Sequence, residues 1–220
     1  MQKLQEDMLS IKAQKRACIY DLLSTVYGKE PSQEFLENFR KSDFSGILEG
    51  LGIKLGEHFK KKPLKELVDE LAVEYTQLFL GPGTHIYPYE SAYCNEKGIL
   101  FSKTALKIKR LIESSGLRYD AAFYENFDHI SVELEFMEKI TNEEAKAWKK
   151  EDKKKILKLL EFQRSFVSEH LVKWVPQFCE NVINQADLSF YREMAKLTRE
   201  YVLLEECEIG DLVLSVEINK

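Results

Sequence analysis

Asp128, His129 and Glu133 are the ionisable side chains whose spacing could do chemistry. His129 and Glu133 are four residues apart, so a helix through them would place both on one face, with Asp128 beside its start. Such a cluster could act as an acid/base site. It could equally be a structural helix start, in which the Asp128 carboxylate is the N-cap and accepts hydrogen bonds from first-turn amides. Spacing alone favours the structural interpretation.

The motifs of common enzymes and metalloproteins are missing from the sequence. No histidine belongs to a His-Glu-x-x-His or paired Glu-x-x-His arrangement, and there is no Gly-x-Ser-x-Gly elbow. Gly81-Pro82-Gly83 follows an expected helix and lacks the spacing of a phosphate-binding loop. The cysteines form no Cys-x-x-Cys and are expected to be free thiols in a reducing cytoplasm: Cys18, Cys94, Cys179 and Cys207. We therefore predict no catalytic residue, metal or cofactor.

The composition is that of a globular protein. Of 220 residues, 44% are hydrophobic and 31% are charged, with a formal net charge of −5, which disfavours a general nucleic-acid-binding protein. The lysine run at 149–155 is interrupted by Glu151 and Asp152, which is typical of a solvated turn. No apolar stretch reaches the roughly 18 residues of a membrane span, and residues 1–7 lack the apolar core of a secretory signal. The chain is expected to stay in the cytoplasm.

Helical spacing of apolar residues recurs along most of the chain. It predicts helices over residues 3–27, 35–39, 44–55, 63–79, 106–112, 129–140, 153–172, 178–183 and 190–204. Gly28 and Gly116 are placed to end two of them, Gly28 in a left-handed conformation. Pro63 fits a first turn, and Pro176 is expected to punctuate the last part of the series. The longest expected loop covers residues 84–98.

The C-terminal residues have a different pattern. Residues 212–218 read Leu-Val-Leu-Ser-Val-Glu-Ile, which is typical of a strand, although one terminal strand cannot form a sheet by itself. Neither an internal repeat nor a flexible linker divides the rest of the chain. The sequence thus predicts an all-α, single-domain helical bundle over residues 1–205. Residues 206–220 are expected to form a C-terminal tail, and the sequence does not decide whether this tail is extended.

Several short motifs, taken together, resemble one known family. They are Leu78-Phe79-Leu80-Gly81-Pro82-Gly83, Pro88-Tyr89-Glu90-Ser91-Ala92-Tyr93, Asp128-His129 followed by Glu133-Leu134-Glu135-Phe136-Met137, and His170-Leu171 with Trp174 and Phe178. In this order and spacing they resemble the TorD/DmsD (NarJ-like) family of redox-enzyme maturation chaperones over residues 70–205. Tyr89 stands where many members carry Trp, and Phe127 where Pro is common, so the identity of the client is not defined.

This resemblance implies an all-helical, cytoplasmic chaperone that is not an enzyme. Its partner would be the precursor of a molybdenum-containing oxidoreductase, bound through its twin-arginine leader peptide or its apo form until the cofactor is inserted and before export. The resemblance implies no cofactor of the chain's own, no nucleic acid, no membrane insertion, and either a monomer or a homodimer. Two alternatives stay open: a helical adaptor for a folded cytoplasmic partner, and a small-substrate enzyme that uses Asp128, His129 and Glu133.

A twin-arginine leader has a basic front and an apolar middle, so its receptor needs carboxylates beside an apolar groove. The residues expected to bind the peptide are Leu78, Phe79, Gly81, Pro82, Gly83, Pro88, Tyr89, Glu90, Ser91, Tyr93, Asp128, His129 and Glu133. Asp128 could pair bidentately with a guanidinium, which would favour arginine over lysine. Alternatively, Leu78, Phe79 and Tyr93 are core residues that anchor the loop.

Overall fold

The computed structural model describes residues 2–41, 52–81, 85–94, 103–116 and 127–218. Within these ranges the chain is helical with short connections, and its β-structure is limited to one isolated bridge. The expected all-α architecture is therefore confirmed. None of the helices in the described ranges is both long and apolar enough to cross a bilayer.

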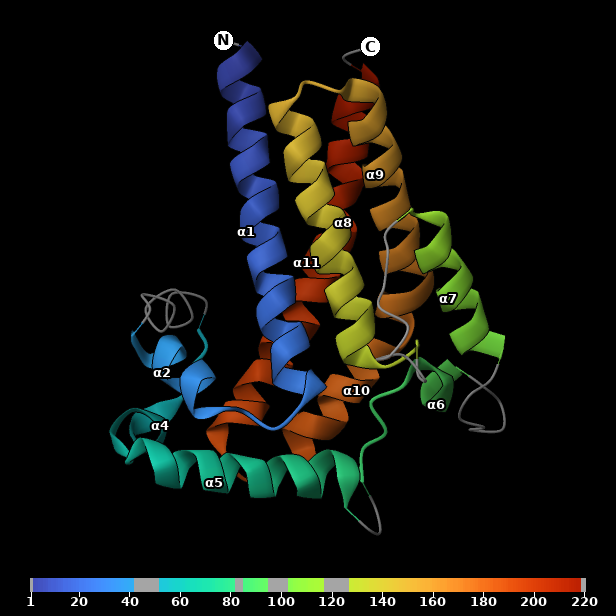
Figure 1. Cartoon of the computed structure of the whole chain (residues 1–220). Helices are drawn as coiled ribbons and strands as arrows, with labels where there is room; N and C mark the ends of the chain where they lie inside the picture. The colour runs from blue at the N-terminus through green and yellow to red at the C-terminus, as the bar shows by residue number, and fades with distance from the viewer. Residues whose placement is uncertain (1, 42–51, 82–84, 95–102, 117–126, 219–220) are drawn as a thin grey trace.

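Four long helices lie side by side and form the body of the molecule (Figure 1). They are α1 (Gln2–Gly28), α8 (Ile130–Lys149), α9 (Lys153–Phe166) and α11 (Ser189–Ile218). The π-helical turn η3 (Val167–Leu171) joins α9 directly to α10 (Val172–Gln185). The chain therefore continues in helical conformation from 153 to 185.

Shorter helices close one end of this bundle and cover one side (Figure 1). Across the end lie α5 (Leu64–Tyr75) and the π-helical turn η1 (Thr76–Leu80), near α2 (Gln33–Lys41) and α4 (Gly56–Lys61). On the side near α9 and α10 lie α6 (Glu90–Cys94) and α7 (Lys103–Ser114).

Aromatic side chains fill the junction between the end helices and the bundle. The Phe79 ring lies 5.1 Å from Tyr75, 6.1 Å from Phe178 and 6.0 Å from Tyr191, measured between ring centroids. Tyr27 of α1 joins the same group, 5.3 Å from Phe178. Each such pair contributes about 0.5–1.5 kcal/mol beyond the burial of its area. The junction is therefore a packed part of the core.

The C-terminal residues are helical, so the strand-like interpretation of 212–218 is wrong. Helix α11 runs through residues 205 and 206 without a break and ends at Ile218. Ile209, Val213 and Val216 are buried at helical spacing, which places one face of this segment against the bundle. A short run rich in Val and Leu satisfies both periodicities, and packing against the bundle selects the helix.

Four further expectations about the elements are corrected in whole or in part. Pro176 lies inside α10 rather than between helices; it follows the π-helical turn η3. The expected loop contains a short helix, α6. Gly28 ends α1, but its φ is not positive, whereas Gly116 has φ +80° just after α7, as a helix-ending glycine should. Of the helix expected over 44–55, residues 44–51 lie outside the described residues, and 53–55 are not helical.

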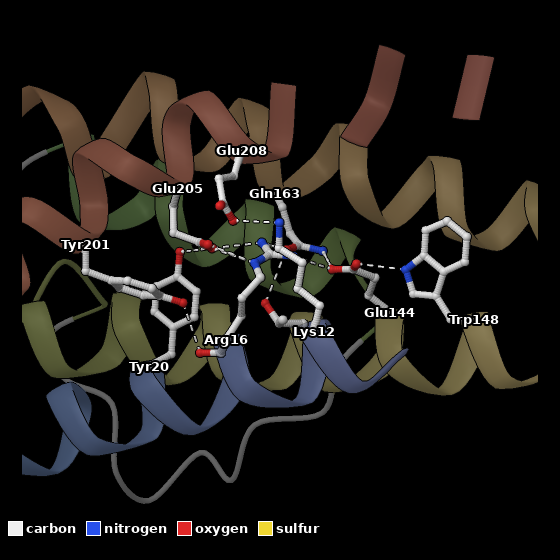
Figure 2. Close-up of polar contacts among 10 residues, drawn as sticks. Lys12, Arg16, Tyr20, Glu144, Trp148, Gln163, Tyr201, Glu205 and Glu208 are labelled. Carbon is white, nitrogen blue, oxygen red and sulfur yellow. Dashed lines mark hydrogen bonds and ion pairs between the residues drawn. The ribbon is translucent and has the colours of Figure 1, made fainter. Parts of the chain in front are cut away.

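A buried guanidinium connects all four long helices (Figure 2). Arg16 of α1 donates from Nε and Nη2 to the Glu205 carboxylate of α11 at 2.8 Å each. It also donates to Glu144 of α8 at 2.9 Å and to the side-chain carbonyl of Gln163 of α9 at 2.8 Å. Arg16 is 4% exposed, and Glu144, Gln163 and Glu205 are 0–1% exposed, so water cannot replace these partners.

Tyrosine and tryptophan side chains complete the hydrogen bonding of this cluster (Figure 2). Tyr20 donates to Glu205 at 2.9 Å, and Trp148 Nε1 donates to Glu144 at 2.9 Å. Burial by itself lowers the pKa of Arg16, but the charges of Glu205 and Glu144 outweigh it and the net pKa is raised. Burial and the charge of Glu205 raise the pKa of Tyr20, so its hydroxyl stays a donor. The guanidinium therefore stays charged, and each of its three nitrogens donates to a buried acceptor.

Replacing Arg16 by Met should lower the free energy of unfolding by about 3–5 kcal/mol, because Glu144 and Glu205 would then be buried without a cation. Urea denaturation followed by far-UV circular dichroism measures this change. The control is Lys12→Ala, on the neighbouring turn of α1. This change removes a half-exposed ion pair, in which Lys12 Nζ lies 3.0 Å from the Glu208 carboxylate, and should lower the free energy of unfolding by less than about 1 kcal/mol. A loss below 1 kcal/mol in the Arg16 variant would show that the cluster does not hold the bundle together.

Candidate functional site

Two motifs separated by about forty residues in the sequence meet in the structure. The Ile130 amide donates to the Pro88 carbonyl at 2.9 Å, and the Glu90 amide donates to the Asp128 carbonyl at 2.9 Å. This pairing makes an isolated antiparallel bridge between Tyr89 and His129, whose rings lie 5.0 Å apart, edge to face. The first part of the predicted site thus rests directly on the second.

Asp128 caps a different helix from the one expected. Its Oδ2 accepts from the Ser91 amide at 3.1 Å, so the carboxylate satisfies the first turn of α6, 37 residues earlier in the chain. The N-cap of α8 is His129, whose Nδ1 accepts from the Ser131 amide at 3.2 Å. The prediction that Asp128 caps the helix after it is therefore wrong. The backbone bridge between Tyr89 and His129 places the Asp128 side chain against the segment that begins α6.

His129 is neutral at physiological pH. Burial lowers the pKa of its ring to about 4. Because Nδ1 accepts from Ser131, the proton of the neutral ring lies on Nε2, which remains a donor. His129 can cap a helix and offer one N–H group, but it cannot supply a positive charge at neutral pH.

A buried polar cluster lies beneath this bridge. The Glu90 carboxylate accepts from His170 Nδ1 of η3, at 2.9 and 3.2 Å. Glu133 of α8 accepts from Trp174 Nε1 of α10 at 3.2 Å. Burial raises the pKa of Glu133 well above its ordinary value, and the charge of Glu90 raises it further. These four side chains are 0–4% exposed and come from four different elements, so they hold α6 against the bundle.

The predicted peptide-binding residues are mostly buried. Those that are buried are Leu78, Phe79, Pro88, Glu90, Ser91, Asp128 and Glu133. Those that are partly exposed are Gly81, Tyr89, Tyr93 and His129. Pro82 and Gly83 lie outside the described residues. The structure brings Pro88–Tyr93 together with Asp128–Glu133, but it leaves few of these side chains at the surface.

Leu78 and Phe79 have the structural role that the sequence analysis kept as an alternative. Each is 4% exposed, and Phe79 belongs to the aromatic junction. The Leu78 carbonyl accepts from the Ile86 amide at 2.7 Å, which fixes the chain on both sides of Gly81. These residues support the segment that carries Tyr89 and do not line a groove themselves.

Exposed apolar side chains beside this segment were missed by the sequence reasoning. Leu80 is 63% exposed and Tyr87 is 43% exposed. Leu80 lies two residues after Leu78, and Tyr87 directly follows Ile86; Leu78 and Ile86 are joined by the backbone hydrogen bond described above. Tyr87 also contacts the His85 ring at 4.4 Å. Their exposure has no signal in the sequence, because an apolar residue in a run such as Leu78-Phe79-Leu80 looks like core.

His170 was also missed as a member of the site. It belongs to the His170-Leu171 motif that resembles the family, but its partner, Glu90, is 80 residues away, so the motif gives no sign of this pairing. The π-helical turn η3 also marks the position, because such turns are frequent at functional sites. Among the residues that the structure describes, no group of three or more His, Cys, Asp or Glu side chains is arranged to hold a metal ion.

Comparison with known proteins finds relatives along most of the chain. Residues 43–180 match the family described as the nitrate reductase delta subunit. The chain is 30% identical to the chaperone protein TorD of Vibrio parahaemolyticus over 215 residues, which cover 90% of this chain and 97% of that protein. It is also 30% identical to the chaperone protein TorD of Photobacterium profundum, over 87% of this chain and 93% of the relative.

A solved structure of a candidate redox enzyme maturation protein from Archaeoglobus fulgidus is similar at a TM-score of 0.49 and 23% identity. This similarity covers 85% of the present chain and 93% of the other.

Replacing Asp128 by Ala should loosen α6 and leave α8 in place, at a cost of about 1 kcal/mol for the lost cap. Hydrogen exchange measured by mass spectrometry should become faster over residues 90–94 and stay unchanged over 130–134. The matched control is Asp152→Ala, which removes the N-cap that accepts from the Lys155 amide at 3.0 Å and should affect only the start of α9. Faster exchange at the start of α8 in the Asp128 variant would contradict the assignment.

Proposed function

Because the chain belongs to the nitrate reductase delta subunit family, with TorD chaperones among its relatives, we propose that it is a cytoplasmic chaperone for a molybdenum-containing oxidoreductase. In this proposal it binds the twin-arginine leader of the precursor and holds the precursor while the cofactor is inserted. The relatives are named chaperones, which supports a role as a binding protein and not as an enzyme.

The observation that carries the proposal is the exposure of two apolar side chains, Leu80 and Tyr87, which we call the apolar edge. These side chains lie beside the segment that ends in Tyr89, where two of the family-like motifs meet. The apolar middle of a leader peptide, in helical or extended form, could bury them. Tyr89 and Tyr93 are partly exposed and would extend the contact. An aromatic side chain is well suited here because it offers a large apolar area at low entropic cost.

The basic front of the leader needs acceptors at the same edge. Glu30 is exposed, and its carboxylate accepts from the Thr76 hydroxyl at 3.1 Å, at the start of η1. We assign it to contact with the arginines. Asp128 is 1% exposed because it caps α6, so direct pairing between Asp128 and a leader arginine would require α6 to move. In the present conformation Asp128, Glu90 and Glu133 position the segment that binds.

Leader binding can be measured by isothermal titration with a synthetic peptide that carries two adjacent arginines followed by an apolar stretch. Leu80→Ser and Tyr87→Ser should each weaken binding about tenfold, the equivalent of about 1.4 kcal/mol of lost apolar contact. The matched control is Leu214→Ser, because Leu214 is 54% exposed on α11 and far along the bundle. All three variants should keep the wild-type free energy of unfolding within about 0.5 kcal/mol.

Two outcomes would count against the proposal. Equal affinity for the peptide and for its scrambled version would remove the leader as the ligand and favour the helical adaptor, which binds a folded partner. Equal loss of affinity in the Leu214 variant would place the contact elsewhere. A peptide with two lysines in place of the arginines should bind more weakly, because the planar guanidinium can form paired hydrogen bonds with a carboxylate.

A further inference from the structure

The buried carboxyl groups of Glu90 and Glu133 are neighbours, because their partners His170 and Trp174 are four residues apart on one continuous helical segment. Glu133 is 0% exposed, and one of its oxygens accepts from Trp174 Nε1. Its other oxygen, Oε1, is buried and has no N–H or O–H donor. The charge of the neighbouring Glu90 carboxylate raises the pKa of Glu133. Because ionised carboxylates only accept, a proton held between the two groups would give the buried Oε1 the donor that it lacks.

We propose that Glu90 and Glu133 share one buried proton, and that this proton keeps α6 seated against the bundle, so that its loss as pH rises releases α6 and the adjoining Pro88–Tyr89 segment. The seating of α6 follows from the contacts of this cluster alone. The consequence for leader binding rests on the function proposed above.

The other polar and charged groups around the pair do not replace the proton. From η3, His170 donates to Glu90 through Nδ1, and the other ring nitrogen, Nε2, is buried without a partner. Asp128 faces Glu133 as a further negative charge. Helix α10 contributes the Trp174 donor to Glu133, and its Lys173 is near Cys94 at the far end of α6. The contact from α1 is uncharged, a hydrogen bond from Ser24 to the Ser131 carbonyl.

Helix α6 depends on these contacts because it cannot be stable alone. It has five residues, far fewer than an isolated helix needs in water. Its attachments are the Asp128 cap on Ser91, the backbone hydrogen bond from Glu90 to the Asp128 carbonyl, the Glu90 side chain on His170, and the Tyr93 ring 5.5 Å from Trp174. A second buried negative charge beside Glu90 would oppose this seat, which rests on few side-chain contacts.

The direction of the pH effect follows from linkage. Burial first, and then the charge of Glu90, raises the pKa of Glu133 above its value in the unfolded chain, while the Trp174 hydrogen bond opposes the change. The stabilisation is therefore complete below the unfolded pKa of about 4.3 and is lost as the pH rises through the raised pKa of the folded protein. The seated form is the protonated form, and alkaline conditions release it.

The fluorescence of Trp174 reports whether α6 is packed against the bundle, and no ligand is needed for this measurement. In a Trp148→Phe background Trp174 is the remaining tryptophan, since the chain has two. The Glu144 carboxylate keeps Arg16 and Gln163 as partners in that variant. Between about pH 5 and pH 9 the emission of Trp174 should shift to the red and its quenching by acrylamide should increase, with unchanged far-UV circular dichroism of the long helices.

Glu133→Gln is the decisive variant, because its amide can donate to Glu90 at every pH and cannot lose a proton. It should abolish the pH-dependent shift of Trp174 emission. Glu138→Gln on the same helix, whose carboxylate accepts from Asn142 outside the cluster, should keep the shift. A shift that persists in Glu133→Gln, or a wild-type chain with no shift, would overturn the proposal. Should Glu133→Gln not fold, hydrogen exchange of residues 90–94 in the wild-type chain gives the same test: exchange independent of pH, after correction for the intrinsic rate, rejects the switch.

Titration with the synthetic twin-arginine peptide separates the two proposals. If both hold, the affinity of the wild-type chain falls by up to about tenfold per pH unit above the midpoint of the Trp174 shift, and Glu133→Gln removes this fall. A Trp174 shift without peptide binding at any pH rejects the proposed function and keeps the switch. Peptide binding that does not depend on pH, together with constant Trp174 emission, rejects the switch and keeps the function.

Discussion

The buried charge of Arg16 is the constraint that the bundle has to satisfy. A guanidinium out of contact with water needs acidic partners and a hydrogen-bond acceptor for each N–H group that points at the protein. Here the acceptors come from Glu144, Gln163 and Glu205, so one side chain joins α1 to α8, α9 and α11. Hydrophobic contacts between these helices could tolerate sliding by a turn, whereas the Arg16 contacts fix one register.

The two buried polar clusters differ in how well their charges are balanced. Around Arg16, one cation meets two carboxylates (Figure 2). Trp148 donates to the Glu144 oxygen that Arg16 does not reach, and Tyr20 donates to a Glu205 oxygen that also accepts from Arg16. Around Glu133, carboxyl groups gather with fewer donors, and one oxygen is left without an N–H or O–H partner. In the first arrangement the Arg16 guanidinium stays charged, because the charges of Glu205 and Glu144 raise its pKa. The second has a group that can change its charge. The rigid cluster therefore holds the long helices, while the unbalanced one holds only a five-residue helix.

Buried residues of the predicted site can still fix the segments that carry exposed side chains. Leu78 and Asp128 are almost inaccessible, yet each fixes a neighbouring segment that carries exposed side chains. The carbonyl of Leu78 holds Ile86, next to Tyr87, and Asp128 holds the start of α6, next to Tyr89. The resemblance to the family named both of these buried residues. It could not find Leu80 and Tyr87, because exposure depends on which neighbours the folded chain brings near.

The sequence by itself determined the helical class and most helix positions, since apolar residues at helical spacing need a partner face and Gly116 can end a helix where other residues are strained. Only the tertiary structure decided which helix Asp128 caps, that Glu90 meets His170, and that residues 212–218 continue α11. The reason is physical. A helix is specified by contacts three and four residues apart, whereas a cap, a shared proton or a choice between strand and helix is settled by groups tens of residues away.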